Sequence, residues 1–431
     1  MRSARLSASP RFTKAIQTTG VELKGVILSI EMELMLTRRG FKRLQIRTSP
    51  VFKTSQRFPE FKGDRIELDT FKPMPIFSEP YDVKPQLFNL SIPAEKRAFE
   101  SARLQHVKTE VVDTLEEQLV EWLIIRTPKL KEQPERLATE IRKAVGPKGW
   151  DHFGVWAWFP WRNVWVRLLD EKAFVEVRTN RNQLKISAEE QAMLAEKRVG
   201  VVGLSVGSAL AMTLAMERTC GGLKLADFDD LELSNLNRIQ TGVHHLGMPK
   251  SVVLARAIAE VDPFFEVELV REGFTNENAE DFFDRLDVVV DACDQVQAKA
   301  NLRWHAKAHR IPLIMETSDR GMLDVERYDL PDTAFLHGRI SDELLAEMRT
   351  ATGWIPAYFD AFIDVAQASE RGRLSLLALG ESLVGWPQLY SDVAGGGAHA
   401  AHAIRKVLLG ESVADARHYL EWDEQLVESV H

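Results

Sequence analysis

Cysteine is scarce in this chain, since only Cys220 and Cys293 occur among its 431 residues. A structural zinc site of the four-cysteine type is therefore excluded, and no structural zinc is expected. Cys293 has a carboxylate neighbour, Asp294, which should raise the pKa of its thiol. Cys220 follows the expected end of a helix, where the helix dipole also disfavours a thiolate. We expect both cysteines to be structural, and their small number fits a reducing, cytoplasmic environment.

Long apolar runs and a positive charge balance are absent as well. No stretch approaches the roughly 18 consecutive apolar residues that a membrane-spanning helix needs. The most apolar one, residues 26–36, is interrupted by Glu31 and Glu33, so no membrane span is expected. The formal net charge of −8 gives no general reason to expect nucleic-acid binding. The chain is nevertheless long enough to build at least two globular cores.

A repeated pattern of helix and strand begins near Ser187. Such alternation predicts an α/β fold with a doubly wound, mostly parallel (Rossmann-like) sheet, which binds ligands at the carboxyl ends of its strands. We assign this domain to residues 179–431. The expected strands are 199–202, 223–226, 267–270, 288–290 and 311–315.

Residues 1–178 predict a separate α+β domain whose role the sequence does not reveal. We expect helices at 23–37 and 93–125, and another after Pro134. Residues 155–169 predict two strands around a Pro-Trp-Arg-Asn turn and include four tryptophans. These rings either stack on a peptide or a base or are buried against a helix, and we favour burial.

A small-residue turn follows the expected strand 199–202. A strand, a tight turn and a helix N-terminus together form an anion site, because unpaired N–H groups and the helix dipole point at one spot. Gly203 and Gly207 lie in this turn, and Asp227 ends the next strand, where an acid is placed to bind ribose hydroxyls. Ser205 stands where a dinucleotide fingerprint has its second glycine, which weakens an interpretation as an NAD or FAD site.

Polar residues gather after two of the expected strands. Asp229 and the sequence Ser-Asn-Leu-Asn-Arg (residues 234–238) follow the strand that ends at Ala226. Asp-Ala-Cys-Asp (residues 291–294) follows another strand, and Lys250 comes twelve positions after Arg238. Such residues have little use in a simple core, so the pattern predicts a nucleotide pocket.

These elements, in this order, resemble the adenylation domain of the ThiF/MoeB/HesA (ubiquitin-activating-type) superfamily. The resemblance extends from about residue 180 to 325, and is greatest to bacterial ThiF-like proteins with an extra N-terminal domain. It implies that Mg-ATP is bound and that a carboxylate attacks the α-phosphate and expels pyrophosphate. That carboxylate is usually the C-terminus of a small Gly-Gly-ended carrier protein, and the relatives are generally homodimers.

The resemblance also implies roles for individual residues. Asp229 would complete the nucleotide site by holding the 234–238 loop, and Gln295 stands where relatives often have asparagine. Arg181, or alternatively Arg178, would supply an arginine that reaches an ATP phosphate, sometimes across a dimer interface. By the same resemblance, Gly203, Ser205 and Gly207 would form the phosphate-binding turn, and Asp227 would bind the ribose hydroxyls. Asn235 would hydrogen-bond the nucleotide or the acyl end. Arg238 and Lys250 would bind the phosphates, and Asp294 would hold Mg²⁺. Hard Mg²⁺ prefers such oxygen ligands.

Several other positions stay open. Asp291 either takes part in the site or only caps the following helix. Asp319 and Arg320 would either contact the incoming C-terminus or form an ordinary charged turn. Residues 392–399 predict a second glycine turn, and we expect His399 and His402 to be solvated or packed rather than bound to metal.

Two different functions compete with adenylation. The sheet could serve an NAD-dependent oxidoreductase, although Arg238 and Lys250 have no use at a dinucleotide site. The chain could also be a scaffold that binds nucleotide or a carrier and activates nothing. Because no cysteine follows Cys293, we expect adenylation without a self-thioester. The carboxylate itself is not identified: a sulfur carrier, a ubiquitin-like tag, a peptide, a free acid and a modified tRNA base all fit.

Overall fold

The computed structural model describes residues 14–23, 26–37, 40–51, 81–351 and 356–421. The chain divides into two compact units, Met1–Ile76 and Phe77–His431. The described part of the first unit is a three-stranded antiparallel sheet in the order β1-β2-β3. Its strands are β1 (Lys14–Leu23), β2 (Val26–Thr37) and β3 (Gly40–Val51).

The helix predicted at residues 23–37 is wrong, because this segment contains the whole of β2 and the last residue of β1. From Leu28 to Leu34, apolar and polar residues alternate with the period of two that defines a strand with distinct faces. The β-branched residues Val26, Ile27 and Ile30 add to the preference for a strand.

The second unit contains two sheets. The smaller has four strands in the order β4-β6-β7-β5, and only the β5–β7 pair is parallel. Its strands are β4 (Gln86–Asn89), β5 (Glu110–Asp113), β6 (Val155–Phe159) and β7 (Val164–Leu168). The helices around it are α1 (Pro93–Gln105), α2 (Leu115–Arg126), η1 (Pro128–Glu132), α3 (Pro134–Val145), η2 (Trp150–His152) and α4 (Glu171–Arg178).

The single long helix predicted at 93–125 is also wrong, since strand β5 separates α1 from α2. Val111 and Val112 lie in that strand and pair with β7, so tertiary pairing overrides the local helical pattern. The helix predicted after Pro134 is confirmed by α3.

The predicted tryptophan hairpin is confirmed as β6 and β7, and its rings are packed rather than displayed. Trp158 and Trp165 are 3% and 0% exposed and stack with ring centroids 4.9 Å apart. Phe99 of α1 stacks on Trp156 at 5.4 Å. At the turn, Trp161 donates a hydrogen bond to Glu260 Oε1 of helix α7 (Lys250–Val261), which connects this sheet to the larger one.

The larger sheet has seven strands in the order β10-β9-β8-β11-β12-β13-β14. The first five strands run parallel to one another, and β13 pairs antiparallel with both β12 and β14, so the predicted doubly wound, mostly parallel α/β fold is confirmed. The strands are β8 (Arg198–Val202), β9 (Gly222–Ala226), β10 (Glu266–Val270), β11 (Val288–Asp291), β12 (Leu313–Thr317), β13 (Met322–Glu326) and β14 (Ala416–His418).

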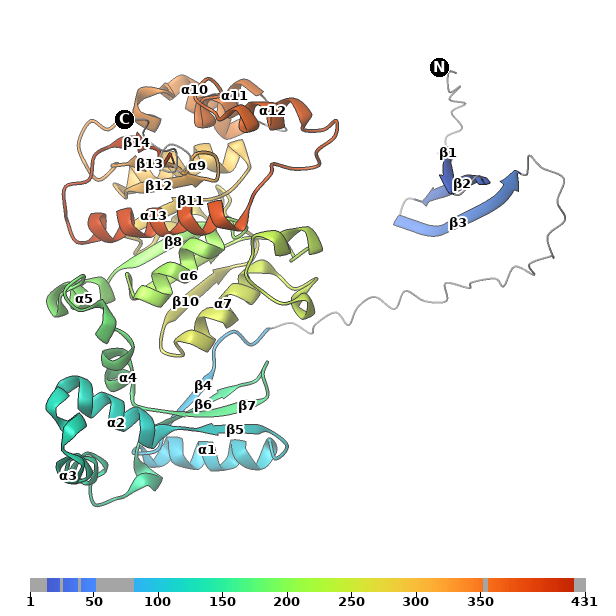
Figure 1. The fold of residues 1–431 in the computed structure, drawn as a ribbon. Coiled ribbons are helices and arrows are strands. Elements are labelled where there is room, and N and C mark those ends of the chain that lie inside the picture. The colour runs from blue at the N-terminus through green and yellow to red at the C-terminus, as the bar shows by residue number, and fades with distance from the viewer. Residues whose placement is uncertain (1–13, 24–25, 38–39, 52–80, 352–355, 422–431) are drawn as a thin grey trace, which may run out of the picture. The chain divides into compact units, whose positions relative to one another are not determined.

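Helices cover both faces of this sheet (Figure 1). One face packs against α6 (Gly207–Glu217), α7 (Lys250–Val261) and α13 (Tyr390–Leu408). The other packs against α8 (Ala279–Phe283), α9 (Val296–His309), α10 (Asp342–Thr350) and α11 (Pro356–Ile363). The remaining helices are η3 (Asn180–Asn182), α5 (Ala188–Ala195), η4 (Leu233–Asn237), η5 (Val243–His245), η6 (Phe335–Gly338) and α12 (Glu370–Ala378). None of the helices in the described residues is long and apolar enough to cross a membrane.

The glycine turn predicted at 392–399 is wrong, because these residues lie inside α13. A Cβ on Gly397 would lie 2.9 Å from the Leu210 backbone nitrogen of α6, and one on Gly396 would collide with Glu316 of β12. The glycines therefore serve the close approach of a helix to its neighbours rather than a turn.

Strand order reverses between β8 and β11. Strand β8 leads through α6 to β9 on one side, whereas β11 lies on its other side. The carboxyl ends of strands flanking such a switch point leave a crevice in which open α/β sheets bind ligands. The domain boundary predicted after residue 178 falls between α4 and η3 and stays a prediction.

Candidate functional site

A cavity of about 400 Å³ opens at the carboxyl ends of β8, β9 and β11, on the two sides of this switch point. It joins segments that are far apart in the sequence but adjacent in the sheet. The predicted site residues that line it are Gly203, Ser205, Asp227, Asp229, Asn235, Arg238, Lys250, Asp294 and Gln295.

The turn after β8 depends on glycine for steric reasons. Gly203 has a φ of +90°, and a Cβ there would lie 2.6 Å from the Ala292 carbonyl carbon of the adjacent segment. Gly207 does not line the cavity; it begins α6, and a Cβ on it would lie 2.8 Å from Val201 Cγ1. Among the described side chains, none caps the first turn of α6, so its N–H groups and the positive end of its dipole stay available for an anion.

Asp227 directly follows β9 and binds the turn from the opposite side. Its Oδ2 accepts a hydrogen bond from the Leu204 backbone at 2.6 Å, and its Oδ1 accepts one from the Asp229 backbone at 2.8 Å. Burial raises the pKa of this carboxyl, and the two backbone donors oppose the rise. Each carboxylate oxygen has a second lone pair, so Asp227 can still accept from a ligand hydroxyl.

Lys250 begins α7 and enters the cavity from the side. Its side chain is 8% exposed, and its Nζ donates to Asp229 Oδ2 at 2.8 Å. Asp229 therefore pairs with Lys250, rather than holding the 234–238 loop as predicted. That loop is fixed by Glu232, whose backbone N–H donates to Asn235 Oδ1 at 3.0 Å in a reciprocal capping arrangement.

Arg238 is held toward the glycine turn by three hydrogen bonds. Its Nε donates to Ser205 Oγ at 2.9 Å, and its Nη1 donates to Ser234 O and Asn237 Oδ1. Burial lowers the pKa of the guanidinium, and the negative charge of Asp294 acts in the opposite direction. Ser205 thus orients the arginine, a contact that a glycine at this position could not make.

Asp294 lies on the other side of the cavity with its side chain exposed. Within the described residues it makes no hydrogen bond or ion pair. A free carboxylate opposite two cations suits Mg²⁺, which prefers a few protein oxygens together with phosphate oxygens. The donor set therefore fits a nucleoside triphosphate with its metal.

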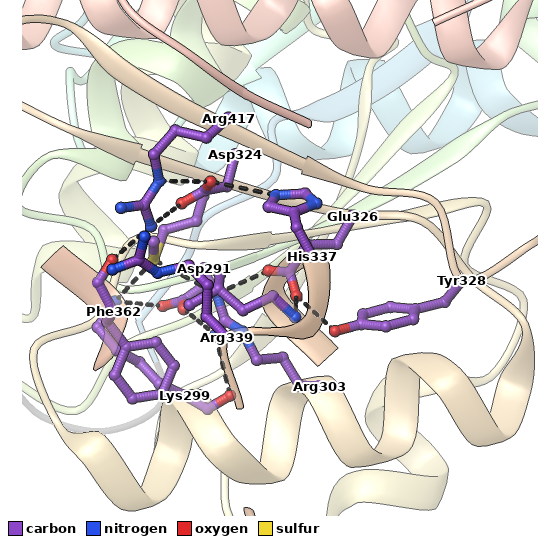
Figure 2. A network of polar contacts seen from close by, with 12 residues as sticks. Asp291, Lys299, Arg303, Asp324, Glu326, Tyr328, His337, Arg339, Phe362 and Arg417 are labelled. Atoms are coloured by element: carbon purple, nitrogen blue, oxygen red, sulfur yellow. Dashed lines mark hydrogen bonds and ion pairs between the residues drawn. The ribbon is translucent and has the colours of Figure 1, made fainter. Parts of the chain in front are cut away.

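Asp291, which ends β11, is not among the residues that line the cavity, and Figure 2 shows it beside Lys299 and Arg303. It is fully buried and pairs with Lys299 Nζ at 2.9 Å and with Arg303 Nη1 at 2.7 Å. These two cations hold the pKa of its carboxyl below the usual value, although burial acts in the opposite direction. Of the two alternatives for Asp291, neither ligand binding nor helix capping describes its contacts; it belongs to an internal ion network.

The network extends across β13. Arg303 Nη2 pairs with Glu326 Oε1 at 2.8 Å, and Tyr328 donates its hydroxyl to Glu326. Nearby, Asp324 accepts from Arg417 Nη2 at 2.8 Å and contacts His337 at 3.2 Å (Figure 2). Because α9 carries both Lys299 and Arg303, the network attaches this helix to β11 and β13 next to the cavity.

Both cysteines lie in surroundings that raise the pKa of a thiol, and their structural role stays a prediction. Cys220 is buried, and burial raises the pKa of its thiol to about 12. The Cys293 thiol donates to Asp291 Oδ1 at 3.2 Å, and burial together with that carboxylate raises its pKa well above the usual value.

Four predicted residues lie away from the cavity. Arg178 donates to the Ala215 and Met216 carbonyls at the far end of α6, and Arg181 lies in η3. Asp319 accepts from the Ser369 backbone and hydroxyl at the start of α12, and Arg320 pairs with Glu421. Of the two alternatives given for Asp319 and Arg320, contact with an incoming C-terminus or an ordinary charged turn, these contacts fit the charged turn.

The sequence interpretation missed an apolar wall of the cavity. Phe228 and Phe274 line it, together with Gly273. Gly273 has a φ of +78°, and a Cβ there would lie 2.8 Å from Phe228 Cδ1. An aromatic residue between Asp227 and Asp229 was the available signal, because a large apolar side chain in a polar loop needs a surface to cover.

Comparisons with known proteins place this site in a family. The profile of the ThiF family matches residues 179–331. An uncharacterised protein of Mycobacterium tuberculosis is 44% identical over 266 residues, which are 61% of this chain and 37% of that protein. The tRNA threonylcarbamoyladenosine dehydratase of Bacillus subtilis is 32% identical over 174 residues, covering 40% of this chain and 67% of that enzyme.

Matches to other ThiF-type proteins are shorter. The sulfur carrier protein ThiS adenylyltransferase of Escherichia coli is 31% identical over 131 residues, which are 30% of this chain and 52% of that enzyme. This chain thus spans about a third to two thirds of the curated relatives named here. The crystal structure of the E. coli tRNA N6-threonylcarbamoyladenosine dehydratase has a TM-score of 0.40 at 23% identity, covering 55% of this chain and 95% of that one.

Proposed function

Because this chain belongs to the ThiF family, we propose that it activates a carboxylate with ATP by adenylation and releases pyrophosphate. The observation that carries this proposal is the convergence of Arg238, Lys250 and Asp294 on one cavity beside the N-terminus of α6. Two cations and a free carboxylate match a triphosphate and its metal. They do not match a dinucleotide, whose pyrophosphate carries less charge and needs no metal.

The reaction requires positioning and charge neutralisation more than a dedicated base. The turn at Gly203 and the first N–H groups of α6 would hold phosphate oxygens, and Asp227 would accept from the ribose hydroxyls. Arg238 is already aimed at the turn by Ser205. Lys250 would exchange its partner Asp229 for a phosphate oxygen, which requires only a small rotation of a lysine side chain.

Asp294 would hold Mg²⁺, directly or through water. When bound, that ion neutralises phosphate charge and helps pyrophosphate to leave. The apolar wall formed by Phe228 and Phe274 would cover the adenine and limit access of water.

For the carboxylate we propose the C-terminus of a small Gly-Gly-ended carrier protein. The sulfur carrier and molybdopterin-synthase adenylyltransferases among the relatives support this choice. Neither Cys220 nor Cys293 provides a thiolate, so the acyl adenylate would pass to its acceptor without a self-thioester. We also propose a homodimer, in which Arg181 of one copy could serve the other.

A second candidate carboxylate is one carried by a modified tRNA base. The tRNA threonylcarbamoyladenosine dehydratases of three bacteria are 30–32% identical over 161–174 residues of this chain, which favours this second candidate. The formal net charge of −8 tells against a nucleic-acid partner, because phosphate contacts dominate such binding.

Nucleotide binding is the first experiment. A ligand at about a hundred times its dissociation constant adds roughly 2.7 kcal/mol to the free energy of unfolding, so thermal unfolding with Mg-ATP, AMP or NAD gives a clear answer. We expect stabilisation by Mg-ATP and none by NAD. Arg238→Met should weaken the binding of ATP more than the binding of AMP. Arg285 is an exposed arginine outside the nucleotide cavity, so Arg285→Met should change the binding of neither nucleotide. Stabilisation by NAD alone would overturn the proposal.

Exchange of labelled pyrophosphate into ATP then separates the substrates. The chain is mixed with Mg-ATP and either a Gly-Gly-ended sulfur carrier protein or tRNA that carries threonylcarbamoyladenosine. Exchange with the carrier alone supports the first choice, and exchange with the tRNA alone selects the second. Nucleotide binding without exchange in either mixture would favour the non-catalytic scaffold.

A further inference from the structure

A second group of side chains that could bind a metal lies at the amino ends of the strands of the large sheet, whereas the nucleotide cavity lies at their carboxyl ends. Glu280 of α8 and His305 and His309 of α9 place their ligand atoms within 4.8 Å of one another. Within the described parts of the chain, no other group of three histidine, cysteine or acidic side chains comes together in this way. Lys197, Asp287 and the 310–312 segment surround it, and they precede strands β8, β11 and β12. The group is therefore separate from the nucleotide cavity.

The two histidines share one face of α9. Residues separated by four positions are neighbours on a helix surface. His305 Nδ1 lies 3.7 Å from Glu280 Oε1, and His309 Nε2 lies 3.4 Å from Glu280 Oε2. These separations exceed those of a good hydrogen bond, yet the three ligand atoms lie within 4.8 Å of one another, around the point that one shared ion would occupy.

The contacts of His305 show which ring nitrogen faces that point as an acceptor. Its Nε2 lies 3.2 Å from Asn276 Oδ1, and Arg349 Nη2 lies 3.3 Å from the same oxygen. Arginine can only donate, so the amide atom it faces is the oxygen. His305 Nε2 must then carry the hydrogen, which leaves the lone pair of Nδ1 in the neutral ring directed at Glu280.

A lone pair directed at a carboxylate repels it unless a cation lies between them. The second ring nitrogen of a metal-binding histidine almost always donates to an oxygen, which sets the tautomer and orients the ring. His305 and Asn276 have this arrangement. In addition, Phe283 stacks on His309 with centroids 5.3 Å apart and an interplanar angle of 15°, so the second ring is also held in place.

One side of the group is open. Glu280 and His309 line a cavity of about 590 Å³, and the Glu280 side chain is 77% exposed. Two imidazoles, one carboxylate and an open position form the ligand set of open zinc sites, in which water takes the fourth place. Composition excluded a four-cysteine site, but this donor set contains no sulfur.

We propose that Glu280, His305 and His309 bind one divalent transition metal ion, with Zn²⁺ as the best match to nitrogen and carboxylate ligands. The ion would join α8 to α9. Since α9 also carries Lys299 and Arg303, the ion would stabilise a helix that begins at Val296, two residues after Asp294. It is independent of the proposed adenylation activity.

The test uses Co²⁺ and Zn²⁺ added to the full chain after treatment with a chelator. Four-coordinate Co²⁺ absorbs strongly in the visible range, so its binding can be followed directly. Displacement of Co²⁺ by Zn²⁺ then gives the affinity of the chain for Zn²⁺. We expect one ion per chain, and loss of at least about tenfold in affinity in His309→Ala and Glu280→Gln. His402→Ala, which removes a histidine of α13, should bind like the unchanged chain.

Two further measurements keep a folding defect from deciding the result. Asn276→Leu keeps all three ligands and should still weaken binding by about 10- to 100-fold, because it removes the acceptor that orients His305. Zn²⁺ should also raise the thermal unfolding temperature of the unchanged chain but not of His309→Ala. Equal affinity in all variants, or no binding by the unchanged chain, would overturn the proposal.

Discussion

Asp291 is the last residue of β11 and Asp294 lies three positions later, yet their electrostatic environments are opposite. Asp291 is fully buried and pairs with Lys299 and Arg303. Asp294 is exposed at the cavity and, within the described residues, makes no ion pair. Two identical side chains thus differ in what they can bind. The buried carboxylate is already paired with cations of its own chain, whereas the oxygens of the exposed carboxylate are accessible to a ligand.

The same contrast applies to the cations. Arg303 is 0% exposed and lies between two carboxylates, so it can take no part in binding. Arg238 and Lys250 are each held by a neutral or exposed partner that a phosphate could replace. A buried charge without a partner is costly, so the fold completes such pairs internally. Only at the edge of the sheet can charges remain incompletely paired.

The largest expected effect comes from breaking the buried network. Arg303→Met should lower the free energy of unfolding by about 3–5 kcal/mol, because Asp291 and Glu326 lose a shared cation in a buried site. Urea unfolding measures it. Arg285→Met, whose side chain is 67% exposed, serves as the control and should cost less than about 0.5 kcal/mol. A loss below about 1 kcal/mol in Arg303→Met would contradict the account of the network.

Asp294→Asn should impair the reaction and leave the stability of the fold unchanged, the opposite of what is expected for Arg303→Met. We expect pyrophosphate exchange to fall by about 10²- to 10³-fold, as when one preorganised polar group is removed from an active site. The free energy of unfolding should hardly change, since the carboxylate is exposed. Asp284→Asn, on an exposed acid outside the cavity, should leave both quantities unchanged. Undiminished exchange in Asp294→Asn would remove Asp294 from the reaction.

Glu316 provides a buried carboxyl without a cation. Burial and the charge of Asp392 raise its pKa to about 8, from 4.5. The folded state therefore holds a proton that the unfolded state releases, so the stability present below pH 4.5 is lost as pH rises toward about 8. Between pH 6 and 7, the free energy of unfolding should fall by about 1.4 kcal/mol relative to Glu316→Gln. Parallel urea titrations of the two proteins check this, and identical pH dependence would show that Glu316 is ionised when folded.

The smallest effect is expected for the exposed ion pair of the cavity. Asp229→Asn should cost less than about 1 kcal/mol in the free energy of unfolding, because the Asp229 side chain is 52% exposed and its attraction to Lys250 is screened by solvent. Urea unfolding at low and high salt measures it. A cost as large as that of Arg303→Met would mean that the distinction between saturated and available charges is wrong.

Much of the α/β unit could be predicted from the sequence. Short apolar segments between helical patterns identified β8 to β12, because buried parallel strands require continuous apolar residues. The polar residues after those strands identified most of the cavity, since carboxyl ends of neighbouring parallel strands meet at one edge. The capping role of Glu232 and the wall formed by Phe228 were missed, as neither has a distinctive spacing.

The errors come from segments whose conformation depends on distant partners. Residues 106–114 could continue a helix on local preference, but β5 pairs with β7, more than fifty residues later in the chain. The glycines of α13 indicate a turn by composition, yet they serve contact with α6 and β12. Local propensity differs by about 1 kcal/mol or less per residue, so pairing and packing readily override it.

The sequence by itself determined where β8 to β12 lie along the chain and which residue types follow them, because strand periodicity and loop polarity are local properties. Only the tertiary structure decided which charges are used up internally. It assigned Asp291 to Arg303 and left Asp294 to the cavity, and it brought Glu280 to the two histidines of α9. The physical reason is that the pairing of a charge depends on burial and on neighbours from other elements, and neither is encoded in sequence spacing.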